Sequence, residues 1–175
     1  MNRYSNILYF FLGMVILSAC NNEDDLPDEP VINEISYDEA AKELLINFTD
    51  GDGNFGLAQG DTLPPYQSLE DTLAETANPF HYNLWLDTYV RRNGEFELLE
   101  FPNTLDFRVP VLTPQGQNKQ LRVNITYDVG VDLNDFTTIS DNFDYGDTLK
   151  FSVILVDRDL NQSNTAETEP AVFID

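Results

Sequence analysis

The chain has 175 residues, of which 42% are hydrophobic and 12% aromatic, enough apolar material for one domain with its own core. It carries 31 acidic and nine basic residues, for a formal net charge of −22. This balance excludes a nucleic-acid-binding protein and a protein that lies on an anionic membrane through its own surface, because both need clustered lysine and arginine. The same charge favours cations, whether metal ions or basic partners.

The first 19 residues have the pattern of a secretion signal. Arg3 precedes an apolar run over residues 7–17, which has signal-peptide length and is too short to span a bilayer. The run ends in Leu-Ser-Ala-Cys, and Cys20 is the only cysteine of the chain. This stretch resembles the lipobox of bacterial lipoproteins, in which cleavage precedes the cysteine and the cysteine is acylated. The resemblance implies a lipid on Cys20 and an anchor in the outer membrane; an ordinary signal peptide and an uncleaved anchor are the alternatives.

Residues 20–30 are predicted to be the lipidated cysteine followed by a disordered tether. The stretch NNEDDLPDEP holds five acids and two prolines, with Leu26 as its only strongly apolar residue. An acidic stretch directly after the lipid-bearing cysteine resembles the surface-export signal of lipoproteins from the Bacteroidota group. That resemblance implies a domain facing the cell exterior, whereas a solvated spacer is the alternative.

From residue 31 to the C-terminus, short apolar runs alternate with turns. Residues 43–50 place Leu44, Ile46 and Phe48 on one face, the period of a half-buried strand. Asn93-Gly94 is the signal of a type I′ hairpin. Strands are expected at 31–37, 43–50, 81–90, 95–101, 121–127, 149–156 and 171–174, with residues 104–111 as an extended edge and 149–156 in the centre of a sheet. A short helix is expected near 69–77, inside a turn-rich insertion at 51–80, and residues 130–147 are expected to lack regular structure.

Seven or eight short strands with little helix predict an all-β fold, an antiparallel two-sheet sandwich of the immunoglobulin or fibronectin-III type over residues 31–175, with a helix-containing insertion. The stretch VDRDLNQSNT resembles the last hairpin of many bacterial Ig-like domains. It departs from them at Leu160, where they often carry glycine, so a wider turn is expected. Together with FTDGDGNFGL, it is similar to small Bacteroidota lipoproteins with an Ig-like domain, a resemblance that implies no particular activity.

A repeated D-x-D-x-N spacing is the sharpest chemical pattern in the chain. It occurs in two loops and supplies six candidate metal ligands: Asp50, Asp52, Asn54, Asp157, Asp159 and Asn161. Calcium takes six to eight oxygens, often from alternate acids on a tight loop. The first copy resembles the start of an EF-hand loop, but Phe55 stands where that loop needs glycine, so it is not an EF-hand.

The expected topology brings the two copies together. If residues 43–49 are strand B and 149–156 are strand F, the loops that follow them lie at the same end of the sandwich. Carboxylates packed that closely repel one another unless an ion lies among them. We therefore expect one calcium site, with Asp61 as an additional candidate ligand. The alternative is that Asp, Asn and Gly simply form good turns, and a full strand at 104–111 would put the loops at opposite ends.

Catalysis has little support in the sequence. His81 is the only histidine, so a zinc cluster has no basis, and no nucleophile motif accompanies it. A carboxylate pair for glycoside hydrolysis stays open, because 31 acids prevent any one pair from being singled out. Trp85 and Tyr89 fall on one face of a strand, where they either pack in the core or form a platform for a sugar or peptide.

Three Asp-Thr-Leu triplets, at 61–63, 71–73 and 147–149, resemble the acceptor of Bacteroidota O-glycosylation. Thr62 and Thr72 lie in the insertion and are the favoured acceptors. The sequence as a whole therefore predicts a lipid-anchored, surface-exposed module that binds a glycan or an outer-membrane protein. A calcium-stiffened structural subunit of an envelope assembly is the second hypothesis, and a glycosidase-type enzyme is the third.

Overall fold

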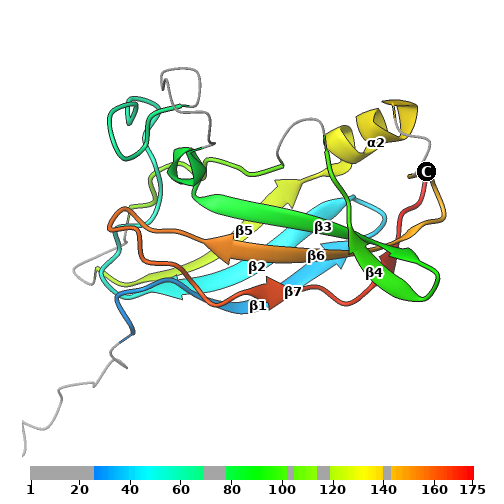
Figure 1. The fold of residues 1–175 in the computed structure, drawn as a ribbon. Coiled ribbons are helices and arrows are strands. Elements are labelled where there is room, and N and C mark those ends of the chain that lie inside the picture. The colour runs from blue at the N-terminus through cyan, green and yellow to red at the C-terminus, as the bar shows by residue number, and fades with distance from the viewer. Residues whose placement is uncertain (1–25, 69–77, 102–104, 114–118, 140–142) are drawn as a thin grey trace, which may run out of the picture.

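The computed structural model describes residues 26–68, 78–101, 105–113, 119–139 and 143–175. Two antiparallel sheets lie face to face, with a helix at one end (Figure 1). The predicted helix at 69–77, Thr72 and Cys20 lie outside the described residues. No helix among the described ranges is long and apolar enough to cross a membrane.

The first sheet has the order β1-β2-β5. Its strands are β1 (Val31–Asp38), β2 (Glu43–Asp50) and β5 (Leu121–Asp128), and β2 pairs antiparallel with both neighbours. Leu44, Ile46 and Phe48 are all buried, as the alternation in the sequence predicted. A register shift between Ile32 and Glu34 marks a bulge near the start of β1.

The second sheet has the order β4-β3-β6-β7, and β8 also pairs with β6. Its strands are β3 (Leu84–Arg92), β4 (Glu95–Leu98), β6 (Thr148–Leu155), β7 (Ala166–Glu167) and β8 (Ala171–Val172). The β3–β4 turn has positive φ at Asn93 (52°) and Gly94 (93°), as a type I′ turn requires. The central place of β6 is confirmed.

These two orders give the strand arrangement of an immunoglobulin-like sandwich. Named in their order within each sheet, the strands of the first sheet, β1-β2-β5, correspond to A, B and E. Those of the second sheet, β4-β3-β6-β7, correspond to C′, C, F and G. The predicted fold class is therefore confirmed: an all-β, two-sheet antiparallel sandwich. The inner faces of both sheets supply the core, whose fully buried side chains include Leu44, Ile46, Phe48, Leu84, Leu149, Phe151, Leu155 and Phe173.

The segment between β5 and β6 differs from the sequence prediction. Residues 130–139, expected to lack regular structure, form helix α2 (Gly130–Ile139), which begins where Asp128 Oδ1 accepts a hydrogen bond from Gly130 N at 2.8 Å. Leu133 and Phe136 are buried, and the Phe136 ring lies 4.4 Å from that of Phe101. Aromatic packing therefore forms a helix from residues with weak intrinsic helix propensity.

Residues 105–112 lie beside the start of β3 and contact the described part of the insertion. A short 3-10 helix, η3 (Pro79–His81), precedes β3. Residues 105–112 form no regular strand, which corrects the expected edge. They make only a bridge between Phe107 and Leu84, and hydrogen bonds such as Leu57 N to Val109 O (2.9 Å). Two prolines flanking this stretch limit its strand pairing.

Candidate metal centre

The two D-x-D-x-N loops lie at the same end of the sandwich. β2 ends at Asp50, and β6 is followed by the Val156–Gln162 bridge and then Asp157. The two strands belong to different sheets but run in the same direction, so both end on the left side of Figure 1. The predicted meeting of the loops is therefore confirmed, and residues 104–111 do not interpose a strand that would separate them.

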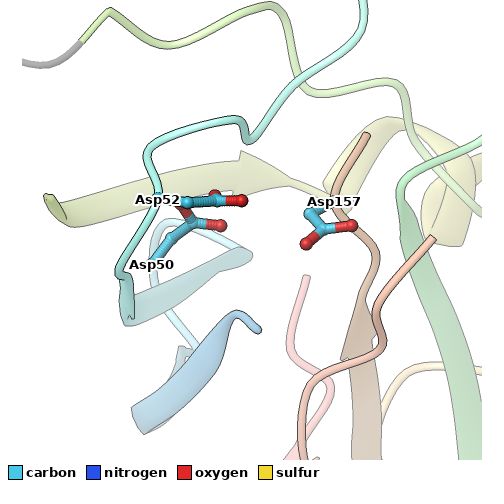
Figure 2. Close-up of side chains that lie close together, drawn as sticks. All are labelled: Asp50, Asp52 and Asp157. Carbon is cyan, nitrogen blue, oxygen red and sulfur yellow. The ribbon is translucent and has the colours of Figure 1, made fainter. Parts of the chain in front are cut away.

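Three carboxylates face one another across the gap between the sheets. Asp50, Asp52 and Asp157 each offer an oxygen, and the three oxygens lie within 4.8 Å of one another. Figure 2 shows Asp50 and Asp52 on one loop pointing toward Asp157 on the other. Asp50 has no exposed surface and Asp157 is 1% exposed, so water screens their charges poorly.

Asp50 holds the least satisfied carboxylate. Its Oδ1 accepts a hydrogen bond from Gly53 N at 2.6 Å, and Gly53 turns the loop with a φ of 71°. Its Oδ2 is buried, and no donor of the described residues reaches it. Burial is the main cause that raises the pKa of Asp50 to about 7; the Gly53 hydrogen bond opposes the increase, and the charges of Asp52 and Asp157 contribute to it.

Asp157 is held in place by Asn161, four residues along its own loop. Asp157 Oδ1 accepts from Asn161 N and Oδ2 from Asn161 Nδ2, both at 2.8 Å. Leu160 adopts a φ of 68° in this turn, at the position where a glycine is common in the similar hairpins. Burial raises the pKa of Asp157 above its usual value, and the two Asn161 hydrogen bonds oppose the increase.

Asn54 connects the two loops. Its backbone N donates to Asp52 Oδ1 at 3.1 Å, and its Nδ2 donates to Asp52 Oδ2 (2.8 Å) and Asp159 Oδ2 (3.0 Å). Its own Oδ1 is buried, and no donor of the described residues reaches it. The six predicted residues are thus brought together in two roles. Three carboxylates converge, while Asn54, Asn161 and the exposed Asp159 hold the loops around them.

Asp61, the additional candidate ligand, has a different partner. Its Oδ2 lies 2.6 Å from Arg158 Nη1 and accepts a hydrogen bond from Ala58 N at 2.8 Å. The Arg158 guanidinium holds the pKa of Asp61 below its usual range. The sequence analysis missed this ion pair, although Arg158 is the only cation within either D-x-D-x-N stretch. Its backbone O accepts from the Tyr66 hydroxyl, so it also fixes the insertion.

The donor set determines which ions the site can hold. All three converging groups are carboxylates, which are hard oxygen ligands suited to calcium, magnesium or manganese rather than to soft metals. Calcium binds oxygens at about 2.3–2.6 Å, so two ligands on opposite sides of one ion are about 5 Å apart. The 4.8 Å limit on the oxygens of Asp50, Asp52 and Asp157 therefore matches a shared calcium ion without rearrangement.

The aromatic platform residues lie on the outer face of the second sheet. Leu84 and Leu86 point into the core, so Trp85 and Tyr89 point outward and are half-buried. Trp85 Nε1 donates to Pro79 O at 2.9 Å and so fastens η3. Lys150 Nζ lies 5.2 Å from the centroid of the Tyr89 ring, a cation–π contact. Both rings thus already have partners within the sandwich.

The remaining predicted residues lie in separate parts of the domain. Thr62 is exposed in the loop beside Asp61, whereas the third triplet threonine, Thr148, lies in β6 and pairs with Val172. His81 ends η3, and its Nδ1 lies 3.2 Å from Arg108 Nη1 and 3.1 Å from Tyr66 O. Only Thr62 of these threonines is therefore both described and placed for access by a modifying enzyme.

No family model matches the chain, and neither the curated proteins nor the solved structures give a match. Arguments about function therefore depend on the residues of the chain itself. Among these, the carboxylate group at the ends of β2 and β6 has the most defined geometry.

Proposed function

We propose that this chain is a lipid-anchored, surface-exposed binding module whose loop end is held together by one calcium ion. The observation that carries the proposal is the convergence of Asp50, Asp52 and Asp157, with Asp50 Oδ2 buried and no donor of the described residues on it. A buried charge without a partner is costly, and either a proton or a cation relieves that cost. At the pH outside a cell, a cation stabilises the site more than a proton does, because it neutralises several carboxylates at once.

The position of the three carboxylates supports a stabilising role for the ion. Asp50 and Asp52 follow β2 in the first sheet, and Asp157 follows β6 in the second. An ion bound to all three connects the two sheets at one end of the sandwich. The Asn54 hydrogen bond to Asp159 already joins the same loops at 3.0 Å, so little ordering remains for the ion to impose.

Calcium fits this site better than magnesium. Calcium accepts irregular sets of six to eight oxygens with one- or two-oxygen carboxylate contacts, whereas magnesium demands octahedral geometry and retains several waters. The three aspartates are placed by two separate loops, and Asp50 and Asp157 are almost fully buried. Such a site excludes the water shell that magnesium retains. Calcium, in contrast, suits a flexible set of ligands that are all oxygens.

The binding role rests on the anchor and on the chemistry of the fold. Cys20 and the acidic stretch after it are the features that favour a lipid anchor and exposure at the surface. His81, the only histidine, has its Nδ1 3.2 Å from Arg108 Nη1 and 3.1 Å from Tyr66 O, so this nitrogen already has partners within the domain. A module that presents a glycan- or protein-binding surface is therefore favoured over an enzyme. A glycan array and co-purification with outer-membrane proteins separate the two ligand classes.

Calorimetric titration of the full chain with calcium tests the metal site. We expect one ion per chain, a higher melting temperature with calcium and a weaker response to magnesium. Asp157→Asn should lose the calcium response, whereas Asp135→Asn, an exposed aspartate on α2, should keep it. The absence of heat and of any melting shift at millimolar calcium would overturn the proposal.

Detergent phase separation tests the anchor independently. The native chain should enter the detergent phase with residues 1–19 removed and a lipid on Cys20, and a Cys20→Ala variant should keep its leader and carry no lipid, as the two masses show. Recovery of the native chain in the aqueous phase would remove the surface location and the roles that depend on it.

A further inference from the structure

Residues 26–30 lie directly on the loop that carries two of the proposed ligands. Gly51, between Asp50 and Asp52, donates a backbone hydrogen bond to Pro27 O at 2.8 Å. Pro30 is buried, and the next residue, Val31, pairs with Thr49 one position before Asp50. Residues 26–30, assigned by the sequence to a free tether, therefore contact the domain at the carboxylate site.

The fit between this segment and Gly51 is close. A Cβ added at Gly51 would lie 2.3 Å from Leu26 O and 2.4 Å from Pro27 O, both well inside van der Waals contact. Gly51 does not adopt a positive φ, so the backbone conformation does not require glycine there. The approach of the tether does require it. The chain thus keeps a glycine between two proposed ligands in order to admit residues 26–27.

Charge connects this contact to the metal site. Residues 26–30 include two exposed acids, Asp28 and Glu29, and they contact the loop whose site holds three converging carboxylates. Without a cation the three carboxylates repel one another and destabilise the loop that residues 26–30 contact. A divalent cation removes most of that repulsion and also fixes the loop on which the tether lies.

We propose that calcium binding and docking of residues 26–30 are coupled, so that calcium fixes the point and direction in which the lipid tether leaves the domain. This inference rests on the proposed calcium site and adds a consequence for the protein on the membrane. With calcium, the tether leaves from the end formed by β2 and β6, and the opposite end of the sandwich is presented outward. Without calcium, residues 26–30 leave the loop and the domain loses a fixed orientation.

Coupling between two binding events is reciprocal, which provides a sharp test. If calcium strengthens docking by some factor, loss of docking weakens calcium binding by the same factor. Gly51→Ala places a methyl group where Leu26 O and Pro27 O lie and leaves all three carboxylates in the chain. Gly60→Ala is the matched control, because a Cβ at Gly60 meets nothing within 4 Å. Pro27→Gly alters the tether alone and leaves the loop sequence intact.

The experiment uses the full chain in detergent, with calcium affinity measured by calorimetry and exchange of the residue-51 amide measured by NMR. In the wild type we expect this amide to be protected with calcium and to exchange faster in a chelator. Gly51→Ala and Pro27→Gly should each lose protection and bind calcium about tenfold more weakly, within the usual range of coupling between sites. Gly60→Ala should match the wild type in both measurements.

The failures of the two proposals are distinguishable. If the wild type binds no calcium, the metal site itself is overturned. If the wild type binds calcium but the residue-51 amide exchanges equally with and without it, the coupling is overturned and the metal site stands. Normal calcium affinity in both Gly51→Ala and Pro27→Gly would overturn the coupling as well.

Discussion

Replacing Asp50 with asparagine should stabilise the protein without calcium and remove the stabilisation that calcium gives. Asp50 has no exposed surface, and burial together with two neighbouring carboxylates raises its pKa from 3.8 to about 7. A pKa increase of about 3 units corresponds to up to about 4 kcal/mol of unfolding free energy lost when Asp50 ionises. Asparagine keeps the oxygen that accepts from Gly53 N and carries no charge. In a chelator at pH 8, we therefore expect Asp50→Asn to be the more stable protein.

The pH dependence follows from the sign of the shift. The folded protein binds the Asp50 proton more tightly than the unfolded chain, so the extra stability is complete below the unfolded pKa, near 4. It is lost as the pH rises from about 4 to about 7. The wild type and Asp50→Asn should therefore be nearly equal in stability at pH 4 and diverge toward pH 8, by on the order of 10 °C in melting temperature.

Calcium should offset this difference. The wild type gains about 2.7 kcal/mol at a calcium concentration one hundred times its dissociation constant and about 4.1 kcal/mol at one thousand times, while Asp50→Asn, which lacks a ligand charge, gains little. Thermal and urea unfolding at several pH values, in chelator and in calcium, measure both effects, and Asp135→Asn is the control. If Asp50→Asn is less stable than the wild type in chelator at pH 8, or the gap does not grow with pH, the electrostatic account of the site is wrong.

Three further substitutions test other parts of the structure. Asn161→Ala removes the hydrogen bond that Asn161 Nδ2 donates to Asp157 Oδ2 at 2.8 Å, and calorimetry should show at least tenfold weaker calcium binding. Unchanged affinity would mean that Asn161 does not hold Asp157 in place for the ion. Asp147→Asn breaks the two-pronged contact with Arg92 at 2.8 and 2.9 Å, and should cost about 1 kcal/mol in urea unfolding. Arg92 lowers the pKa of Asp147, so this contribution is present above pH 4 and lost as pH falls further; equal losses at pH 2 and pH 7 would contradict it. Phe55→Ala empties a fully buried position and should cost about 3–5 kcal/mol, whereas a loss below 1 kcal/mol would mean that the loop collapses into the space.

Strands such as β2 and β5 could be predicted because their apolar residues alternate with polar ones. The bounds of β2 match the predicted range, since Leu44, Ile46 and Phe48 alternate and Asp50 ends the run. β3 was less well placed, because the aromatic residues before Leu84 look like strand residues but belong to η3 and its connection. In this segment Asn78 caps the 3-10 turn, a local hydrogen bond that apolar periodicity does not reveal.

Helix α2 could not be predicted, because its stability comes from contacts distant in sequence. Its residues include threonine, asparagine and aspartate, which favour other conformations in an isolated chain. Phe136 lies between Phe101 and Phe143, at 4.4 and 5.7 Å between ring centroids. A single-sequence pattern does not show that three aromatic residues from separate segments will meet.

The sequence predicted which residues come together at the candidate site, but not what each residue does there. Repetition of D-x-D-x-N, with the expected strand order, was enough to bring six residues together. It could not show that Asp159 turns outward while Asp157 is buried, since this depends on the φ of 68° at Leu160. Nor could it show that Asp61 would pair with Arg158, because that contact crosses 97 residues of chain.

The place of the proposed ion explains how this sandwich can do without a disulfide. Antibody domains join strands B and F, one from each sheet, by a disulfide between the sheets. In this chain the only cysteine is Cys20, so an internal disulfide cannot form. Asp50 at the end of β2 and Asp157 after β6 belong to the corresponding strands, and an ion between them joins the same two sheets. The difference is that a disulfide is permanent, whereas the proposed link would exist only when calcium exceeds its dissociation constant. The stability of the domain, and through Gly51 the attachment of residues 26–30, would then follow the calcium concentration around it.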